Sequence, residues 1–170
     1  IQQLMTHTAG FSYGFTFSPN TDDPIDKLYE KAELFKAKDL DDFVNRLATL
    51  PLRYEPGAKW HYSVAVDVMG LVVQRISGTS FDVYLQKEIF VPLGMYDTFF
   101  SVPKDKKHRF LPNQEWDAEK GIVTKIVESP DWNYESVTLF SGGAGLVSTA
   151  YDYLRFAEML RNGGALDGKR

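Results

Sequence analysis

The chain has 170 residues, 44% hydrophobic and 25% charged, which is typical of one folded globular domain and argues against disorder. Its net charge of −4 excludes general electrostatic attraction to nucleic acid or anionic lipid, so we expect neither as a partner. The absence of cysteine excludes disulfides, thiolate catalysis and zinc–thiolate sites. No apolar run approaches the ~20 residues that span a bilayer. Compartment and oligomeric state are left open.

The first 50 residues are predicted to be mostly helical. Residues 1–8 have the apolar spacing of the last turns of a helix, which Gly10 ends. Residues 10–24 are rich in glycine, polar and aromatic residues and are predicted to form an ordered loop. A helix over 24–38 and an amphipathic helix over 39–50 follow, the second with aspartates at its start.

The next predicted helix covers residues 64–76. It is apolar on nearly every side and is broken mainly by Asp67, Gln74 and Arg75. A helix with this pattern is expected to be buried all round, so its N-terminus should lie near the middle of the molecule. Ser63 is the predicted N-cap.

Two capping boxes predict the starts of later helices. Thr79 with Asp82 begins a helix that runs to about residue 90. Thr149 with Asp152 begins the last helix, which Gly163–Gly164 closes.

Short strands are predicted between these two helices. The apolar pairs within residues 98–127 are strand-like, and residues 141–145 form a glycine-rich turn. Helices followed by short strands and another helix predict a mixed α/β fold. Because the sequence starts without methionine and stops within an unfinished element, we expect residues 1–170 to be a single partial domain, truncated at both ends. Such a piece is expected to expose apolar surface and to dissolve poorly alone.

Two serine motifs lie in unsuitable contexts. Gly10–Gly14 matches the nucleophile elbow G-x-S-x-G around Ser12, but that motif needs a sharp strand-to-helix turn, and here a helix end precedes it. Ser101 and Lys104 match S-x-x-K, but Pro103 in an extended stretch opposes the helical turn that would join them. We therefore expect neither serine to be a nucleophile.

Three blocks of sequence resemble the superfamily of serine β-lactamases, D-alanyl-D-alanine peptidases and family VIII carboxylesterases. The first is Leu-Met-Thr-His-Thr-Ala-Gly-Phe at residues 4–11. The second begins with Trp-His-Tyr-Ser-Val at residues 60–64, and the third is Gly-Gly-Ala-Gly-Leu-Val-Ser-Thr at 142–149. The blocks keep the family's order and cover most of the chain. The resemblance implies a β-lactamase/transpeptidase-like fold, of which this piece holds mostly the helical domain plus short antiparallel strands.

The resemblance also implies a serine hydrolase that works through an acyl-enzyme without metal or cofactor. In this family a Ser-x-x-Lys serine attacks the carbonyl, and a tyrosine shares the proton transfers with the lysine. Tyr62 matches that tyrosine and is the predicted general base. The serine and lysine are expected upstream of Ile1, and a third motif on a sheet strand is expected downstream of Arg170, so we expect the isolated piece to be inactive.

The position of Tyr62 suits a base for a separate reason. A phenol ordinarily has a pKa of about 10, so it acts as a base near neutral pH only where its charged form is stabilised. A neighbouring ammonium or a helix N-terminus has that effect. Tyr62 stands just before the most apolar predicted helix. The alternative is a buried tyrosine that makes one hydrogen bond.

Val64 stands where β-lactamases and peptidases of this family carry asparagine. That asparagine binds an amide carbonyl of the substrate, and valine has no hydrogen-bond donor to replace it. The expected substrate is therefore a small ester, which makes a carboxylesterase the first hypothesis. A β-lactamase or D-alanyl-D-alanine carboxypeptidase, acting on an amide or β-lactam-like substrate, is the alternative. A non-catalytic ligand-binding or interaction protein that keeps the fold is a further one.

Six further residues are predicted to contact the substrate because they flank the tyrosine or lie in blocks that border the cleft: Phe11, Tyr13, His61, Val64, Gly142 and Gly143. For His61 the alternative is simple packing. The histidines lack the spacing of metal ligands, so no metal site is expected.

Overall fold

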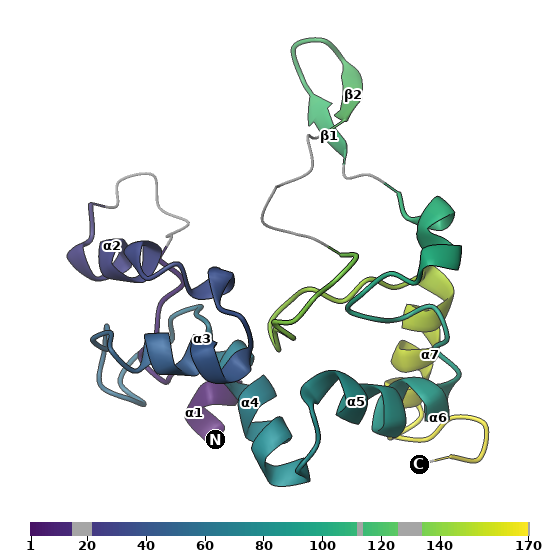
Figure 1. Ribbon diagram of the computed structural model, residues 1–170, viewed down its shortest axis with the longest axis horizontal. Helices are drawn as coiled ribbons and strands as arrows, with labels where there is room; N and C mark the ends of the chain where they lie inside the picture. The colour runs from purple at the N-terminus through teal and green to yellow at the C-terminus, as the bar shows by residue number, and fades with distance from the viewer. Residues whose placement is uncertain (15–21, 112–113, 126–133, 170) are drawn as a thin grey trace.

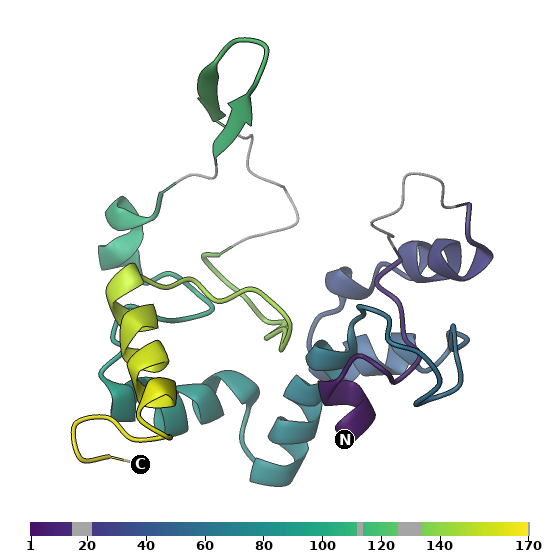
Figure 2. The same cartoon turned by 180° about the vertical axis from the view of Figure 1, so that it is seen from behind.

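A computed structural model describes residues 1–14, 22–111, 114–125 and 134–169 (Figure 1). The fold is mixed α/β, mostly helical, with one two-stranded antiparallel sheet in the described residues. Helices α1–α4 form one side of the molecule in Figure 1 and α5–α7 the other, while the hairpin of β1 and β2 projects away from both. The segment 134–149 returns between the two groups of helices (Figure 2).

The first helices are shorter than predicted. Helix α1 spans Gln2–Met5 and ends before His7, whose φ of 52° is left-handed. Helix α2 spans Pro24–Lys31, and a separate 3-10 turn, η1, spans Leu34–Lys36. The predicted helix over 24–38 is therefore broken, because Glu33 has a φ of 46°.

Aspartates begin both longer helices of this region. In α2 the Asp23 carboxylate accepts from the backbone N–H groups of Ile25 and Asp26. Helix α3 spans Leu40–Leu47, and Asp39 accepts from the Asp42 N–H at 2.8 Å. These contacts satisfy N–H groups that have no partner within the helix, and the second confirms the predicted acidic start.

Helix α4, Ala65–Ser77, is the longest in the described residues. The prediction that it is buried all round was wrong, because only Ala65, Asp67 and Gly70 are buried and Ile76 is 77% exposed. Helices α1, α3 and α5 contact α4, and Arg75 and Ile76 in its C-terminal turn remain exposed. The predicted cap was also wrong: Val64 is the N-cap, and it makes no side-chain hydrogen bond.

Helices α5 (Phe81–Leu85) and α6 (Val91–Leu93) are joined by a π-helical turn, η2 (Gln86–Phe90). The capping box predicted from Thr79 and Asp82 was wrong, because Ser80 is the N-cap and makes no side-chain hydrogen bond. The last helix, α7 (Ala150–Arg161), begins as predicted, with Thr149 Oγ1 accepting from the Asp152 N–H at 3.2 Å.

The strand prediction was partly wrong. A 3-10 helix, η3, covers Lys104–Arg109, and strands β1 (Gln114–Asp117) and β2 (Ile122–Lys125) pair with Trp116 opposite Val123. Of the predicted apolar pairs, the one at 122–123 lies in strand β2, and Phe99 forms an isolated bridge with Val147. The pair at 110–111 lies in no strand or bridge. The pair at 126–127 lies outside the described residues.

Three apolar clusters hold the helices together. The first packs α2, η1 and α3 around six buried residues: Tyr29, Leu34, Ala37, Phe43, Leu47 and Val64. The second centres on Leu40, Phe81 and Phe100, and the third joins Phe90, Leu93 and Met95 to α7. Across the described part of the chain, no helix has the length and apolarity needed to cross a membrane.

Candidate active site

A cavity of about 460 Å³ opens beside the N-terminal end of α4. Its wall comes from the loop after α1, from α2 and η1, from the start of α4 and from the glycine turn, and includes Tyr13, Tyr29, Phe35, Tyr62, Asp67 and Gly143. A volume of this size falls in the range of small-molecule pockets, ~300–1,000 Å³. Tyr13 and Phe35 stack with ring centroids 6.1 Å apart, so part of the wall is aromatic.

Tyr62 lines this cavity and is 40% exposed. Its ring lies between two others, with centroid distances of 4.7 Å to His7 and 5.1 Å to Tyr13. His7 also fixes both neighbours of Tyr62: its carbonyl accepts from the His61 N–H at 2.8 Å, and its Nδ1 accepts from the Ser63 N–H at 3.3 Å. These contacts orient the residues that lead into α4.

Asp67 is a buried polar residue of the cavity wall that sequence reasoning did not assign to the site. It is 1% exposed, in the first turn of α4. Its Oδ1 accepts from the Ser141 hydroxyl and from the Gly143 N–H at 3.2 Å, and its Oδ2 accepts from the Tyr13 hydroxyl at 3.4 Å. Burial raises the pKa of Asp67, while these donors oppose the rise. The carboxylate thus joins three segments of the cavity wall.

The glycine turn approaches α4 more closely than a side chain would allow. A Cβ on Gly142 would lie 2.3 Å from the Val66 carbonyl oxygen and 3.1 Å from the Gly70 nitrogen. A Cβ on Gly143 would lie 2.9 Å from Asp67 Oδ2 and 3.1 Å from the Tyr13 hydroxyl. Two glycines are therefore needed to bring the turn to the cavity.

We expect Gly142→Ala to lower the free energy of unfolding of the full-length protein by about 1–3 kcal/mol, as overpacking against fixed neighbours does. The clash is with backbone atoms of α4, so the turn must move away and the cavity must widen. Urea denaturation measures the change. Gly70→Ala is the matched control, because its Cβ would meet neighbours at 3.4 Å, an ordinary contact. Equal destabilisation by both substitutions would contradict the predicted clash.

The other predicted contact residues lie away from the cavity wall. Phe11 packs against the first apolar cluster, and Val64, with no exposed surface, is part of it. His61 packs edge-on against Tyr54 at 5.9 Å, and its Nε2 is buried without a hydrogen-bond partner among the described residues. Burial, followed by the charge of Arg53, lowers the pKa of His61. Tyr13, Tyr62 and Gly143 share the cavity, with Gly142 next to it.

The two serine motifs are not arranged for catalysis. Ser12 has no exposed surface and donates to Asp26 Oδ1 at 2.5 Å. Ser101 accepts from the Val137 N–H at 3.0 Å, and Lys104 begins η3 only after Pro103. Neither motif forms the turn that its chemistry requires, as predicted.

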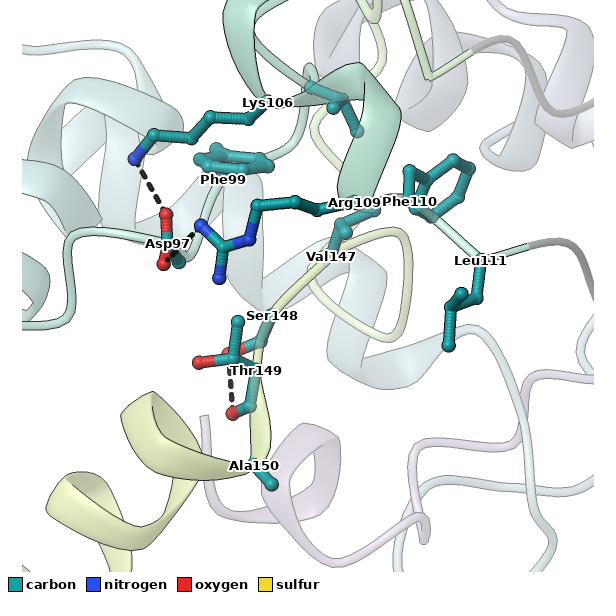
Figure 3. A pocket seen from close by; sticks show the side chains of 11 residues that line it. Asp97, Phe99, Lys106, Arg109, Phe110, Leu111, Val147, Ser148, Thr149 and Ala150 are labelled. Carbon is teal, nitrogen blue, oxygen red and sulfur yellow. Dashed lines mark hydrogen bonds and ion pairs between the residues drawn. The ribbon is translucent and has the colours of Figure 1, made fainter.

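A second cavity, of about 390 Å³, lies between η3 and the start of α7 (Figure 3). Asp97 is paired there with Lys106 at 2.6 Å and with Arg109 at 2.8 Å. Hydrogen bonds from these two cations hold the pKa of Asp97 below its ordinary value. Both cations are engaged by one carboxylate, so this cavity is a structural ion-pair cluster.

The lowered pKa of Asp97 predicts an acid-sensitive contribution to stability. A carboxyl group whose pKa is lowered by folding stabilises the fold above its unfolded pKa, and this stability is lost as the pH falls through the folded pKa. We expect thermal midpoints measured from about pH 7 to about pH 3 to fall less for Asp97→Asn than for wild type. Parallel profiles would contradict the prediction. Asp22→Asn is the control, since Asp22 pairs with Lys27 at the surface.

The model of the family described as Beta-lactamase matches residues 1–170. This chain belongs to the β-lactamase family. Protein Rv1367c of Mycobacterium tuberculosis is 35% identical over 100% of this chain and 40% of its own length. Esterase EstB of Burkholderia gladioli is 31% identical over 95% of this chain and 44% of its own.

A solved structure of simvastatin synthase (LovD) from Aspergillus terreus, the LovD6 mutant, superposes on this β-lactamase-family chain with a TM-score of 0.73 at 26% identity. The match covers 97% of this chain and 37% of that one. The fold is therefore a partial β-lactamase-like fold. The chain spans about 40% of the length of the curated relatives it matches.

Proposed function

We propose that the full-length protein is a serine hydrolase that forms an acyl-enzyme, most specifically a carboxylesterase for small esters, with Tyr62 as its general base. The serine attacks the ester carbonyl, and Tyr62 takes up a proton and returns it as the alcohol leaves. Water then repeats the sequence and releases the acid. The nucleophilic serine and its lysine are proposed to belong to the remainder of the protein, as the relatives' greater length allows.

One observation carries this proposal: Tyr62 is partly exposed on the wall of a substrate-sized cavity, at the N-terminal end of α4, in a chain of this family. The N-terminal end of a helix carries partial positive charge, which favours an anionic phenolate nearby. The backbone contacts from His7 fix the tyrosine before any substrate arrives. A base that is already positioned needs little reorganisation to react.

Three observations support an ester substrate. Val64 supplies no hydrogen-bond donor at the position where the family's asparagine binds an amide carbonyl, and its side chain is wholly buried. One relative is named as an esterase, and its match with this chain covers 44% of its own length. The aromatic pair Tyr13 and Phe35 offers apolar surface for an acyl or alcohol group.

The test is hydrolysis by the full-length protein of a short-chain p-nitrophenyl ester, measured beside hydrolysis of a chromogenic β-lactam. The proposal expects kcat/KM for the ester to exceed that for the β-lactam by at least about tenfold, since a lost polar contact strongly reduces recognition of the amide. Preferential β-lactam hydrolysis would make the β-lactamase alternative correct. Inertness toward both substrates would favour the non-catalytic alternative.

A further inference from the structure

A chain of hydrogen bonds runs from Tyr62 to the protein interior. The rings of Tyr13 and Tyr62 lie in contact, with centroids 5.1 Å apart, and a side-chain hydrogen bond to Tyr62 contributes to the raised pKa of Tyr13. Tyr13 also donates to Asp67 Oδ2 at 3.4 Å. The other oxygen of Asp67 is held by Ser141 and Gly143. The cavity surface is thus linked to a buried carboxylate anchored to the glycine turn.

Tyr13 faces more acceptors than it can serve at one time. A phenol carries one hydrogen, so at any instant Tyr13 donates either to Asp67 or to Tyr62. When Tyr62 is protonated, its own hydroxyl can donate to Tyr13, and Tyr13 then donates to Asp67. When Tyr62 is deprotonated it can only accept, and the hydroxyl of the neighbouring Tyr13 can donate to it.

Tyr13 keeps the hydrogen that this exchange needs, and Asp67 has the geometry of its acceptor. Burial, followed by the negative charge of Asp67, raises the pKa of Tyr13, which keeps its hydrogen on the hydroxyl. Both oxygens of Asp67 accept, Oδ2 from Tyr13 in the loop after α1 and Oδ1 from Ser141 and Gly143 in the glycine turn. Loss of the Tyr13 donor still leaves the two donors on Oδ1.

We propose that Tyr13 and Asp67 act as positioning residues in a hydrogen-bond switch, in which the Tyr13 hydroxyl donates to Asp67 while Tyr62 is protonated and to Tyr62 once it is deprotonated. Asp67 competes with the deprotonated Tyr62 for the hydrogen of the Tyr13 hydroxyl, and this competition influences the pH at which Tyr62 loses its proton. This inference rests on the proposed role of Tyr62 as base.

The other charged or titratable groups near Tyr62 come from three elements. His7 packs on its ring from the loop after α1, and Tyr29 and Glu30 of α2 lie in the cavity wall. Glu33, the N-cap of η1, forms an ion pair with Lys36 in the same wall. All five stay unchanged in the variants below. Differences between those variants therefore report on Tyr13 and Asp67.

The test measures kcat/KM for ester hydrolysis against pH in the full-length protein. In Tyr13→Phe the donor to the deprotonated base is lost, so the rising limb of the profile should move to higher pH by about one unit. In Asp67→Asn the competing acceptor and its charge are removed, so the limb should move to lower pH. A purely structural role would lower kcat without moving the limb in opposite directions.

The double variant separates the switch from a simple charge effect. If Asp67 acts through Tyr13, Asp67→Asn should move the limb much less in the Tyr13→Phe background than in wild type. An equal shift in both backgrounds would mean that charge alone acts, and would overturn the switch. If Asp67→Asn fails to fold, Tyr13→Phe decides: a limb at the wild-type pH overturns the proposal.

Asp152→Asn is the matched control. Asp152 is 3% exposed and accepts from the Asp97 N–H at 2.7 Å and the Thr98 hydroxyl at 2.9 Å, but it lies outside the cavity. Its substitution should leave the limb at the wild-type pH. Unmoved limbs in Tyr13→Phe and Asp67→Asn, with wild-type ester hydrolysis intact, would overturn the switch and retain the proposed function. Absence of ester hydrolysis in wild type would overturn both.

Discussion

In the full-length protein, Tyr62→Phe is expected to lower kcat/KM for a p-nitrophenyl ester by about 10²–10⁴-fold, the usual contribution of general acid–base catalysis. Phenylalanine keeps the ring that packs against His7 and Tyr13 at 4.7 and 5.1 Å and removes only the hydroxyl. Because Tyr62 is 40% exposed, loss of that hydroxyl should change the thermal midpoint little.

Tyr96→Phe is the control for this experiment. Tyr96 is 68% exposed and lies outside the wall of the candidate site, so removal of its hydroxyl should leave kcat/KM within about twofold of wild type. Full activity in a folded Tyr62→Phe protein would contradict the role proposed for Tyr62. A parallel loss in both variants would point to a general effect on folding.

Arg53→Met is expected to lower the free energy of unfolding by about 3–5 kcal/mol, the usual cost of removing one partner of a buried ion pair. Arg53 donates from Nη1 to Asp26 at 2.8 Å and from Nη2 to Asp23 at 2.7 Å. The Asp26 side chain is only 6% exposed, so without the guanidinium its charge stays buried with much less compensation. Urea denaturation of the full-length protein measures the loss.

Arg46→Met tests the same chemistry at the surface. Arg46 pairs with Asp42 one helical turn away at 3.0 Å, and its side chain is 36% exposed. Exposed pairs of this kind contribute less than about 1 kcal/mol. A similar loss from both arginines would contradict burial as the cause. The Arg53 pair also connects α2 to the segment before α4, so its loss is expected to loosen the cavity wall.

The family was predictable because it depends on short contiguous blocks. The block at residues 60–64 resembles the family's tyrosine motif, and the family match covers the whole chain. Local chemistry also predicted two helix starts, at Asp39 and Thr149, because a cap depends only on residues within one turn.

The features that the sequence did not reveal depend on distant contacts. Asp67 was visible as a break in an apolar helix, but its partners Ser141 and Gly143 lie 74 and 76 residues away. The left-handed backbone of His7 follows from no local signal. Val64 and Phe11 flank the site in sequence, yet packing in the first cluster turns them away from it.

The helix boundaries failed for a related reason. Apolar periodicity predicts which side of a helix can be buried, but not how many neighbours are present to bury it. Ile76 continues the apolar pattern of α4 and is nevertheless exposed. The burial of Asp67 and the exposure of Ile76 on one helix show that contacts with neighbouring elements outweigh composition.

The contacts between Asp67 and the glycine turn also have a consequence for folding kinetics. Closing loops of 74 and 76 residues costs chain entropy before any contact is gained. The contacts of α3 with η1 and α4, by contrast, join residues much closer in sequence. We therefore expect the helices to form early and the glycine turn to dock late. Local opening of that turn would then expose the Gly143 amide to hydrogen exchange and Asp67 to solvent while the apolar clusters stay intact, so we expect the glycine turn to be a less stable unit than the helices.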